Sequence, residues 1–262
     1  MGRNHEVTSR HPLLDHSGRL SEPGWSRSLV QQYDRSQIKA PKWRIKEWDY
    51  YLVLSDSFAG AFTISDDGYI GLQSVSLLTF GEKPWEHTET VLNAFPMGKI
   101  GLPSDSSKGP TVYSDKRLQM RFDVEPGFRT IKCSFNNFCD GKPFECDIRL
   151  EQPQMDSMVI ATPWDKKGHF YYNQKINCMR ATEGIAKITV RDSGSGVAPE
   201  DREKIFDRFF TADRAHTAGK GTGLGLSICK RIMEMHGQSI RLLDTEEGAA
   251  FRFTLRCAPR EL

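Results

Sequence analysis

The sequence has little net charge, no long apolar run and no cysteine pair at metal-binding spacing. Its 36 Lys and Arg residues nearly balance 34 Asp and Glu residues, for a formal charge of +2, so nothing calls for nucleic acid or an anionic membrane. No apolar run is long enough to span a bilayer, and the N-terminus lacks a signal-peptide core. The six cysteines form no Cys-x-x-Cys motif, which favours free thiols in a reducing compartment. We therefore expect a cytoplasmic chain with no membrane span and no nucleic-acid partner.

Three regions differ in composition and periodicity. Residues 1–42 are polar and interrupted by proline and glycine, which predicts an extended N-terminal arm. Residues 43–184 alternate with period two and are rich in β-branched and aromatic residues, which predicts an antiparallel sandwich or barrel. Residues 185–262 change to strand, glycine-rich turn and helix patterns. With 262 residues, the chain is long enough to form one large core or two smaller ones.

The segment Arg44–Tyr51 is unusual for a core strand because it carries charges on both faces and three aromatic rings. Two interpretations remain open. It is an edge strand with one solvated face, or some of its charges point into a barrel lumen that holds a polar ligand group. On the second interpretation, the candidate ligand region is Lys46, Glu47, Trp48 and Asp49.

Several separated motifs connect this region with a known family. Gly24-Trp25-Ser26-Arg27, the segment Arg44–Tyr51, Gly68-Tyr69 and Phe170–Asn177 together resemble domain of unknown function 2804 over roughly residues 10–184. The resemblance implies a lipocalin-like β-barrel and no established chemistry. The family pattern ordinarily continues beyond this point, so residues 43–184 are expected to be a truncated form of the domain.

The strand-like run Lys187–Arg191 leads directly into a glycine-rich turn. By alternation, Asp192 shares the inward face with Ile188 and Val190, and an inward carboxylate is costly unless a group donates to it. Gly194 and Gly196 remove side chains that would keep a flat ligand from the backbone. An amine-bearing ring such as adenine satisfies both features.

A second glycine-rich turn follows an aromatic segment. Phe206 and Phe209 recur with their neighbours at helical spacing, and a polar stretch then leads to a run of alternating glycines at 221, 223 and 225. The following helix carries Leu224, Ile228, Ile232 and Met235 on one apolar stripe. A glycine-rich turn at a helix N-terminus is suited to phosphate, because free backbone N–H groups and the helix dipole both favour an anion.

These ordered motifs resemble the catalytic ATP-binding domain of sensor histidine kinases, which has the Bergerat-type fold. The resemblance implies ATP and Mg²⁺ as cofactors, ATP-dependent protein-histidine kinase activity, and a response regulator or a kinase hairpin in trans as partner. Asp192 would accept from the adenine amine, and the second turn would hold the phosphates. The nucleotide-binding residues implied are Asp192, Gly194, Gly196, Phe206, Phe209, Gly221, Thr222, Gly223, Leu224 and Gly225.

The resemblance is incomplete where metal should be bound. In the family, an Asn-bearing helix before the first glycine turn contacts metal and phosphates, since Mg²⁺ requires octahedral oxygen ligands. Asn177, one turn after Asn173, imitates that pattern only loosely, and His5-Glu6 lies among helix breakers that exclude a phosphoacceptor hairpin. No catalytic residue is assigned, and we expect weak nucleotide binding without autophosphorylation.

The predicted fold class is α+β. It joins an N-terminal β sandwich or lipocalin-like barrel to a partial two-layer α/β Bergerat-type domain. Two further interpretations stay open: a lipocalin-like protein that binds a small ligand, and a composite (chimeric) reading frame whose parts have no joint function.

Overall fold

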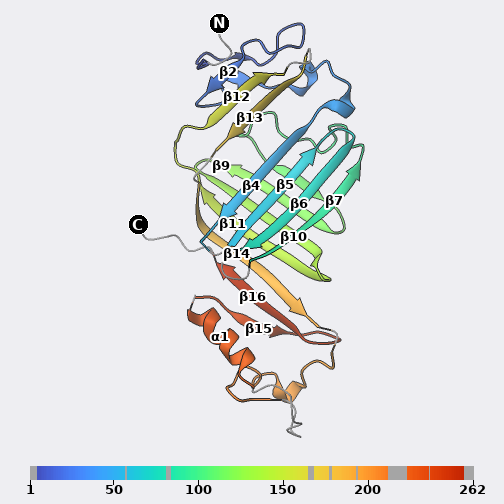
Figure 1. Ribbon diagram of the computed structural model, residues 1–262, viewed down its shortest axis with the longest axis vertical. Helices are drawn as coiled ribbons and strands as arrows, with labels where there is room; N and C mark the ends of the chain where they lie inside the picture. The colour runs from blue at the N-terminus through green and yellow to red at the C-terminus, as the bar shows by residue number, and fades with distance from the viewer. Residues whose placement is uncertain are drawn as a thin grey trace. The chain divides into compact units, whose positions relative to one another are not determined.

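The computed structural model describes residues 5–56, 58–80, 84–164, 168–176, 179–192, 194–211, 223–235 and 237–256, and Figure 1 labels their strands and helices. The chain divides into two compact units. Unit 1 comprises Met1–Lys132 and Arg149–Thr182, and unit 2 comprises Cys133–Ile148 and Glu183–Leu262. Because unit 2 takes the tip of a hairpin from the middle of the chain, the units differ from the three consecutive regions expected from composition.

Unit 1 is built mainly from antiparallel strands, as the period-two pattern predicts. Four of them, β4, β5, β6 and β7, pair with one another in sequence order. The turn between β5 and β6 contains Gly68, whose φ of 79° favours glycine. Within unit 1, β8 pairs with β9, and β12 lies between β13 and β2. The bounds are β4 Glu47–Leu54, β5 Phe58–Asp66, β6 Ile70–Thr79, β7 Trp85–Ala94, β8 Thr111–Ser114, β9 Leu118–Glu125, β2 Gly24–Ser26, β12 Met158–Pro163 and β13 Phe170–Lys175.

The sheets are open, so the expectation of a closed barrel is wrong. In the sheet β4-β5-β6-β7, for example, β4 and β7 are edge strands. Its core side includes Phe62 and Ile64, and β9 contributes Phe122; all three are almost completely buried. Alternation along a strand specifies its two faces, but closure depends on whether the outermost strands pair, which the pattern does not encode.

The N-terminal segment is folded, and the expected extended arm over residues 1–42 is corrected for residues 5–42. Short strands β1 (His11–Pro12) and β3 (Gln31–Gln32) pair in parallel, and Leu13 and Leu14 are buried. Two single-turn 3₁₀ helices, η1 (Arg35–Gln37) and η2 (Lys42–Arg44), follow.

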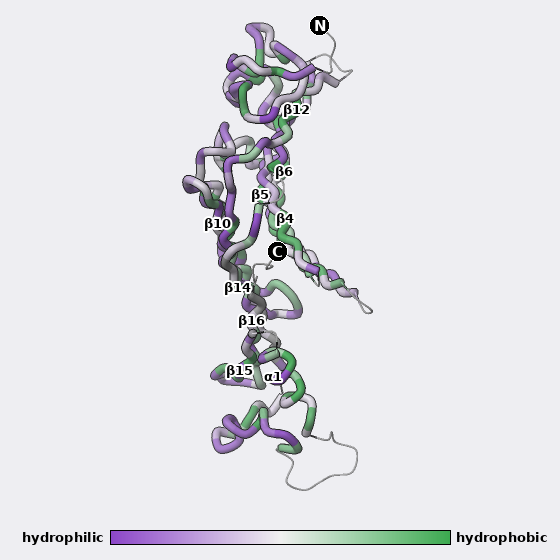
Figure 2. Tube along the Cα trace, turned by 90° about the vertical axis from the view of Figure 1, so that its left-hand side faces the viewer, coloured by the Kyte–Doolittle hydropathy of each residue, from purple (hydrophilic) through white to green (hydrophobic). Residues whose placement is uncertain are grey.

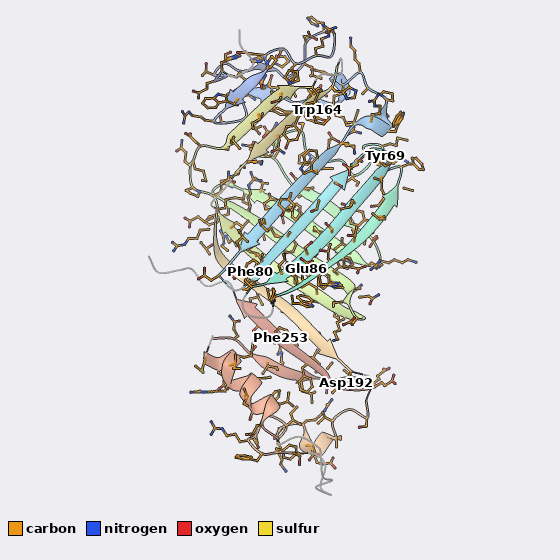
Figure 3. All side chains as sticks on the ribbon, viewed as in Figure 1. Tyr69, Phe80, Glu86, Trp164, Asp192 and Phe253 are labelled. Atoms are coloured by element: carbon orange, nitrogen blue, oxygen red, sulfur yellow. The ribbon has the colours of Figure 1, made fainter. Side chains whose placement is uncertain are left out.

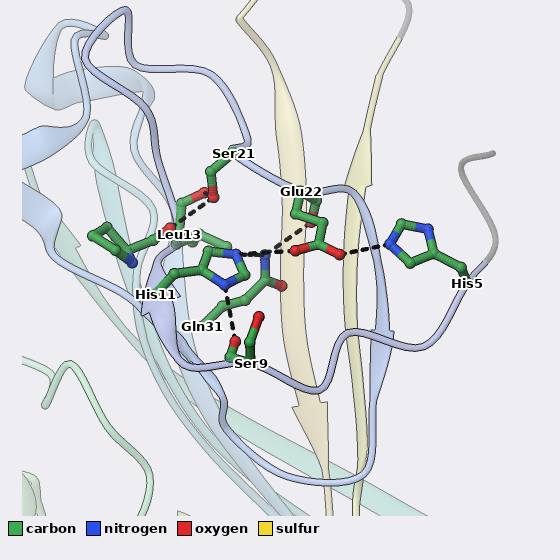
Figure 4. A network of polar contacts seen from close by, with 8 residues as sticks. His5, Ser9, His11, Leu13, Ser21, Glu22 and Gln31 are labelled. Carbon is green, nitrogen blue, oxygen red and sulfur yellow. Dashed lines mark hydrogen bonds and ion pairs between the residues drawn. The ribbon is translucent and has the colours of Figure 1, made fainter. Parts of the chain in front are cut away.

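Polar contacts close this N-terminal segment upon itself (Figure 4). His5 Nε2 lies 2.7 Å from Glu22 Oε1, and Gln31 Nε2 donates to the backbone carbonyl of Glu22 over 2.8 Å. The backbone N–H of Trp25 donates to the carbonyl of His5. His5 therefore lies in a paired, extended segment and not on a helix.

Unit 2 has a small sheet and one α-helix among its described residues. Strand β16 (Ala250–Arg256) lies between β15 (Ile240–Leu243) and β14 (Arg180–Arg191), with Ile185 opposite Arg256 in the last pair. Parts of β10 (Phe128–Cys139) and β11 (Lys142–Glu151) complete the unit, and both strands also contribute residues to unit 1. The helices are η3 (Pro199–Asp201) and α1 (Gly225–Met235), and α1 mixes hydrophobic and hydrophilic positions (Figure 2).

Among the described residues, no helix combines the length and apolarity that a membrane crossing requires. Of the cysteines that the structure describes, Cys133 and Cys229 are free thiols.

Candidate functional site

Asp192 lies directly after the end of β14 and is exposed (Figure 3), which contradicts the expected inward orientation. Its Oδ1 accepts hydrogen bonds from the backbone N–H of Gly194 over 2.9 Å and of Ala249 over 3.2 Å. These two bonds hold the pKa of the Asp192 carboxyl below its usual value, with Gly194 the larger cause. Strand alternation ends at Arg191, so a residue beyond it turns to satisfy nearby backbone donors instead.

The first glycine turn lines a cavity of about 240 Å³ together with Arg202 and the turn between β15 and β16. Gly196 has a φ of 74°, and a side chain there would come within 2.8 Å of the Gly248 carbonyl oxygen. Glycine is therefore required at this close approach. Asp192 is not among the lining residues, so the predicted adenine contact and the cavity are adjacent features and do not form one enclosed pocket.

The sequence did not predict the second wall of this cavity. This wall consists of Leu242 and Leu243 at the end of β15 and of residues 245–248 in the turn that follows. Arg202, which also lines the cavity, pairs with Asp244. The Nε atom of Arg202 is buried without a hydrogen-bond partner among the described residues. Arg202 and this turn are more than forty residues apart in the sequence, so no local pattern could have predicted that they line one cavity.

The two rings of the aromatic segment, Phe206 and Phe209, differ in burial. Phe206 lies edge-on to Phe251, with ring centroids 6.2 Å apart, and the Lys230 ammonium is 5.6 Å from the Phe206 ring. Phe209 is 73% exposed and has a φ of 64°. Only Phe206 therefore contributes to the packing of unit 2, although helical spacing had placed both rings on one apolar face.

The second glycine turn is described only from Gly223 onward; Gly221 and Thr222 lie outside the described residues. The Gly223 carbonyl accepts from the backbone N–H of Phe209 over 3.1 Å. This bond joins the aromatic segment to the described part of the glycine turn. Leu224 precedes α1, which Gly225 begins, and its carbonyl accepts from the Ile228 N–H and the Ser227 hydroxyl.

No metal-binding helix is found among the described residues. Asn173 lies on strand β13, opposite Ile160, and Asn177 lies outside the described residues. The described part of the chain also contains no group of three His, Cys, Asp or Glu residues placed to hold a metal ion. Asn173 is therefore part of a strand and not of a helix, and the residues that the structure describes do not fit a family-type Mg²⁺ site.

The candidate ligand region of unit 1 is largely committed to internal contacts. Glu47 accepts from the Tyr33 hydroxyl over 2.5 Å and pairs with Arg35, and Asp49 accepts from the Thr111 hydroxyl. Trp48 and Lys46 are exposed on the other face. Trp48 lies 6.1 Å from the Tyr171 ring, and the Lys46 ammonium lies 5.3 Å from the Tyr69 ring. β4 is thus an edge strand with an exposed face, as the first interpretation predicts, and its acids face inward to partners within the protein and not into a barrel lumen.

The strand β14, the glycine turns and helix α1 lie within one segment that is similar to a family of ATPases. Residues 167–259 match the family described as histidine kinase-, DNA gyrase B- and HSP90-like ATPases. Residues 4–199 match a domain of unknown function, DUF2804, and the chain belongs to this family. The two matches overlap over residues 167–199, so β13 and β14 fall within both.

Sensor proteins are among the similar curated proteins. Sensor protein SrrB from Staphylococcus aureus strain NCTC 8325 / PS 47 is 32% identical over 168 residues, and these cover 63% of this chain and 28% of that protein. The same protein from strain MRSA252 gives the same figures. The chain thus spans about 28% of the length of these relatives.

Proposed function

We propose that unit 2 binds an adenine nucleotide weakly, with Asp192 as the acceptor for the adenine amine. The orientation of this carboxylate carries the proposal. Among the described residues, both of its hydrogen bonds go to Oδ1, which leaves Oδ2 to accept from a ligand. Asp192 is exposed among the residues that the structure describes, and a hydrogen bond open to water contributes less than an enclosed one.

The phosphates would lie at the start of α1. Gly223, Leu224 and Gly225 precede or begin this helix of 11 residues, and its first backbone N–H groups and dipole favour an anion. The described residues provide no family-type ligand set for Mg²⁺, because Asn173 is on a strand. Weak affinity follows from this loss, since metal normally neutralises the phosphates.

Calorimetric titration of the full chain with a nonhydrolysable ATP analogue tests the proposal. We expect saturable but weak binding that Asp192→Asn weakens by roughly tenfold or more, because it removes a charge-assisted hydrogen bond. Glu203→Gln is the matched control, since Glu203 is an exposed acid of the same unit. Equal heats from the wild type and Asp192→Asn would contradict the assignment.

We further propose that the chain alone does not autophosphorylate, and that any phosphoryl transfer needs a kinase hairpin supplied in trans. His5 lies in a paired extended segment and so lacks the helical setting of a phosphoacceptor. Incubation with labelled ATP and Mg²⁺ is expected to give no acid-labile phosphate; ATP-dependent phosphohistidine in the purified chain would overturn this. A response regulator is the proposed downstream partner, in the cytoplasm.

Binding of a small amphipathic ligand by unit 1 is the second candidate. The inward acids on β4 favour a polar contact inside the sheet, although Arg35 and Thr111 already satisfy them. A lipid or pigment that co-purifies with the chain and is lost in Asp49→Asn would support this function. Its retention in Asp49→Asn would contradict a polar contact through the inward acids.

A further inference from the structure

The sheet β4-β5-β6-β7 has an unusual distribution of charge between its faces. The register places Glu47, Asp49, Asp66 and Glu89 on the face that also carries buried Phe62 and Ile64. On the opposite face, the aligned positions are uncharged except for Glu86. An antiparallel sheet with one solvated face ordinarily shows the reverse, with charges outside. The neutral face is defined by Trp48, Tyr50, Leu52, Leu54, Ala59, Ala61, Thr63, Ser65, Leu72, Ser74, Ser76, Leu78, Glu86, Thr88, Thr90 and Leu92.

Four of the five large exposed apolar side chains on the neutral face lie on its edge strand β4, and the fifth, Leu92, lies on β7. Trp48, Tyr50, Leu52 and Leu54 are 38%, 53%, 48% and 64% exposed, and they follow one another along β4. Within the described residues, β4 pairs only with β5, so its other side presents backbone donors and acceptors. Edge strands normally carry lysine, proline or a bulge to prevent pairing with another chain. From Glu47 to Leu54 the strand has none of these on its outward side.

We infer that β4 pairs antiparallel with β4 of a second copy of this chain, through a two-fold axis at Tyr51. In this register Trp48 lies opposite Leu54 of the second copy, and Tyr50 lies opposite Leu52. Aromatic and aliphatic side chains so placed form favourable cross-strand pairs on the neutral face. A two-fold axis uses the same surface twice, so the uncharged outward side chains of one β4 meet those of the other, and Lys46, which precedes the strand, lies outside the paired segment.

The inward acids exclude registers displaced toward the start of β4. With the axis at Tyr51, Asp49 lies opposite Val53 and Glu47 lies opposite Ser55. With the axis at Trp48, Glu47 and Asp49 of the two copies would lie directly opposite each other, and like charges opposed across strands are destabilising. Glu86 is on β7, three strands away from the seam, and at about 4.8 Å per strand it lies outside the contact. The axis at Tyr51 also keeps all four exposed apolar side chains of β4 within the pairing, which registers displaced to either side do not.

Light scattering coupled to size-exclusion chromatography of the full chain over a dilution series tests the inference. We expect a reversible dimer whose dissociation constant rises by at least about tenfold in Leu52→Lys, because a charge then replaces an apolar pair at the seam. Thr88→Lys is the matched control: it places the same charge on the same face but on β7, and it should leave the dimer unchanged.

Hydrogen exchange then locates the contact. The outward amides of β4 should exchange more slowly in the dimer than at dilutions that give monomer, and this difference should vanish in Leu52→Lys. A chain that is monomeric at every concentration, a dimer that survives Leu52→Lys, or equal loss in Thr88→Lys would each overturn the proposed pairing. So would a stoichiometric complex with a different protein.

Discussion

Gly223 and Gly225 lie two residues apart in the second glycine turn, but only Gly223 is constrained by its surroundings. Its φ is 67°, and a Cβ there would lie 2.6 Å from the Phe210 carbonyl oxygen and 2.7 Å from the Phe209 carbonyl carbon. We expect Gly223→Ala to destabilise unit 2 by about 1–3 kcal/mol, because backbone must move to relieve the contact. Urea unfolding of the full chain, followed in unit 2, measures this.

Gly225→Ala is the control at the same turn. A Cβ at Gly225 meets nothing within 4 Å, and alanine favours the first turn of α1, so stability should be unchanged or rise by up to about 1 kcal/mol. Equal losses in both variants would mean that the turn is not formed as described.

The free cysteines of unit 2 differ in reactivity because they differ in burial. Burial raises the pKa of the Cys133 thiol to about 12, and the thiolate is the reactive form. Cys229 on α1 is exposed. We expect a maleimide or iodoacetamide reagent at mildly alkaline pH to label Cys229 rapidly and Cys133 only after unfolding, as read by peptide mass spectrometry. Rapid labelling of Cys133 in the native chain would contradict its burial.

At the scale of single elements, much of the fold was predictable because strands and hairpin turns are local. The turn between β5 and β6, for example, has the local sequence Asp66-Asp67-Gly68, which is typical of a hairpin turn, and Gly68 has the required positive φ. The folded N-terminal segment was not predictable. Its strand β2 pairs with β12, more than a hundred residues later in the chain, and short polar strands carry too little alternation to reveal such a partner. The orientation of Asp192 was predicted wrongly for a different reason: strand alternation stops at Arg191, where β14 ends.

Helix α1 formed where its apolar stripe predicted, but the stripe is not buried. Ile228, Ile232 and Met235 are 51%, 50% and 72% exposed, and no residue of the helix is buried. We expect Ile232→Gln to change the free energy of unfolding by no more than about 0.5 kcal/mol. Ile205→Ala should cost about 2–5 kcal/mol, since Ile205 is only 7% exposed. A large loss in Ile232→Gln would show that another part of the chain covers α1.

At the scale of the whole molecule, two family patterns share one segment. Residues 167–199 lie within both matches, where strand β13 lies in unit 1 and most of β14 in unit 2. The ATP-binding family would have its asparagine helix before the first glycine turn. Here Asn173 lies instead on β13, a strand of unit 1. The sequence motifs could show that both patterns are present, but only pairing partners show which one determines the backbone.

Whether the shared segment is well folded decides between a joined module and a composite reading frame without joint function. From Ile185 to Arg191, β14 pairs with β16, and Lys187 lies opposite Thr254 and near Glu145. A paired strand resists proteases, because cleavage needs local unfolding. Limited trypsin digestion read by mass spectrometry should therefore not cut after Lys187 among the earliest sites. Thr254→Pro is the control, since it disrupts the opposite strand and should accelerate that cut. A composite frame predicts early cleavage between residues 176 and 190 in the wild type.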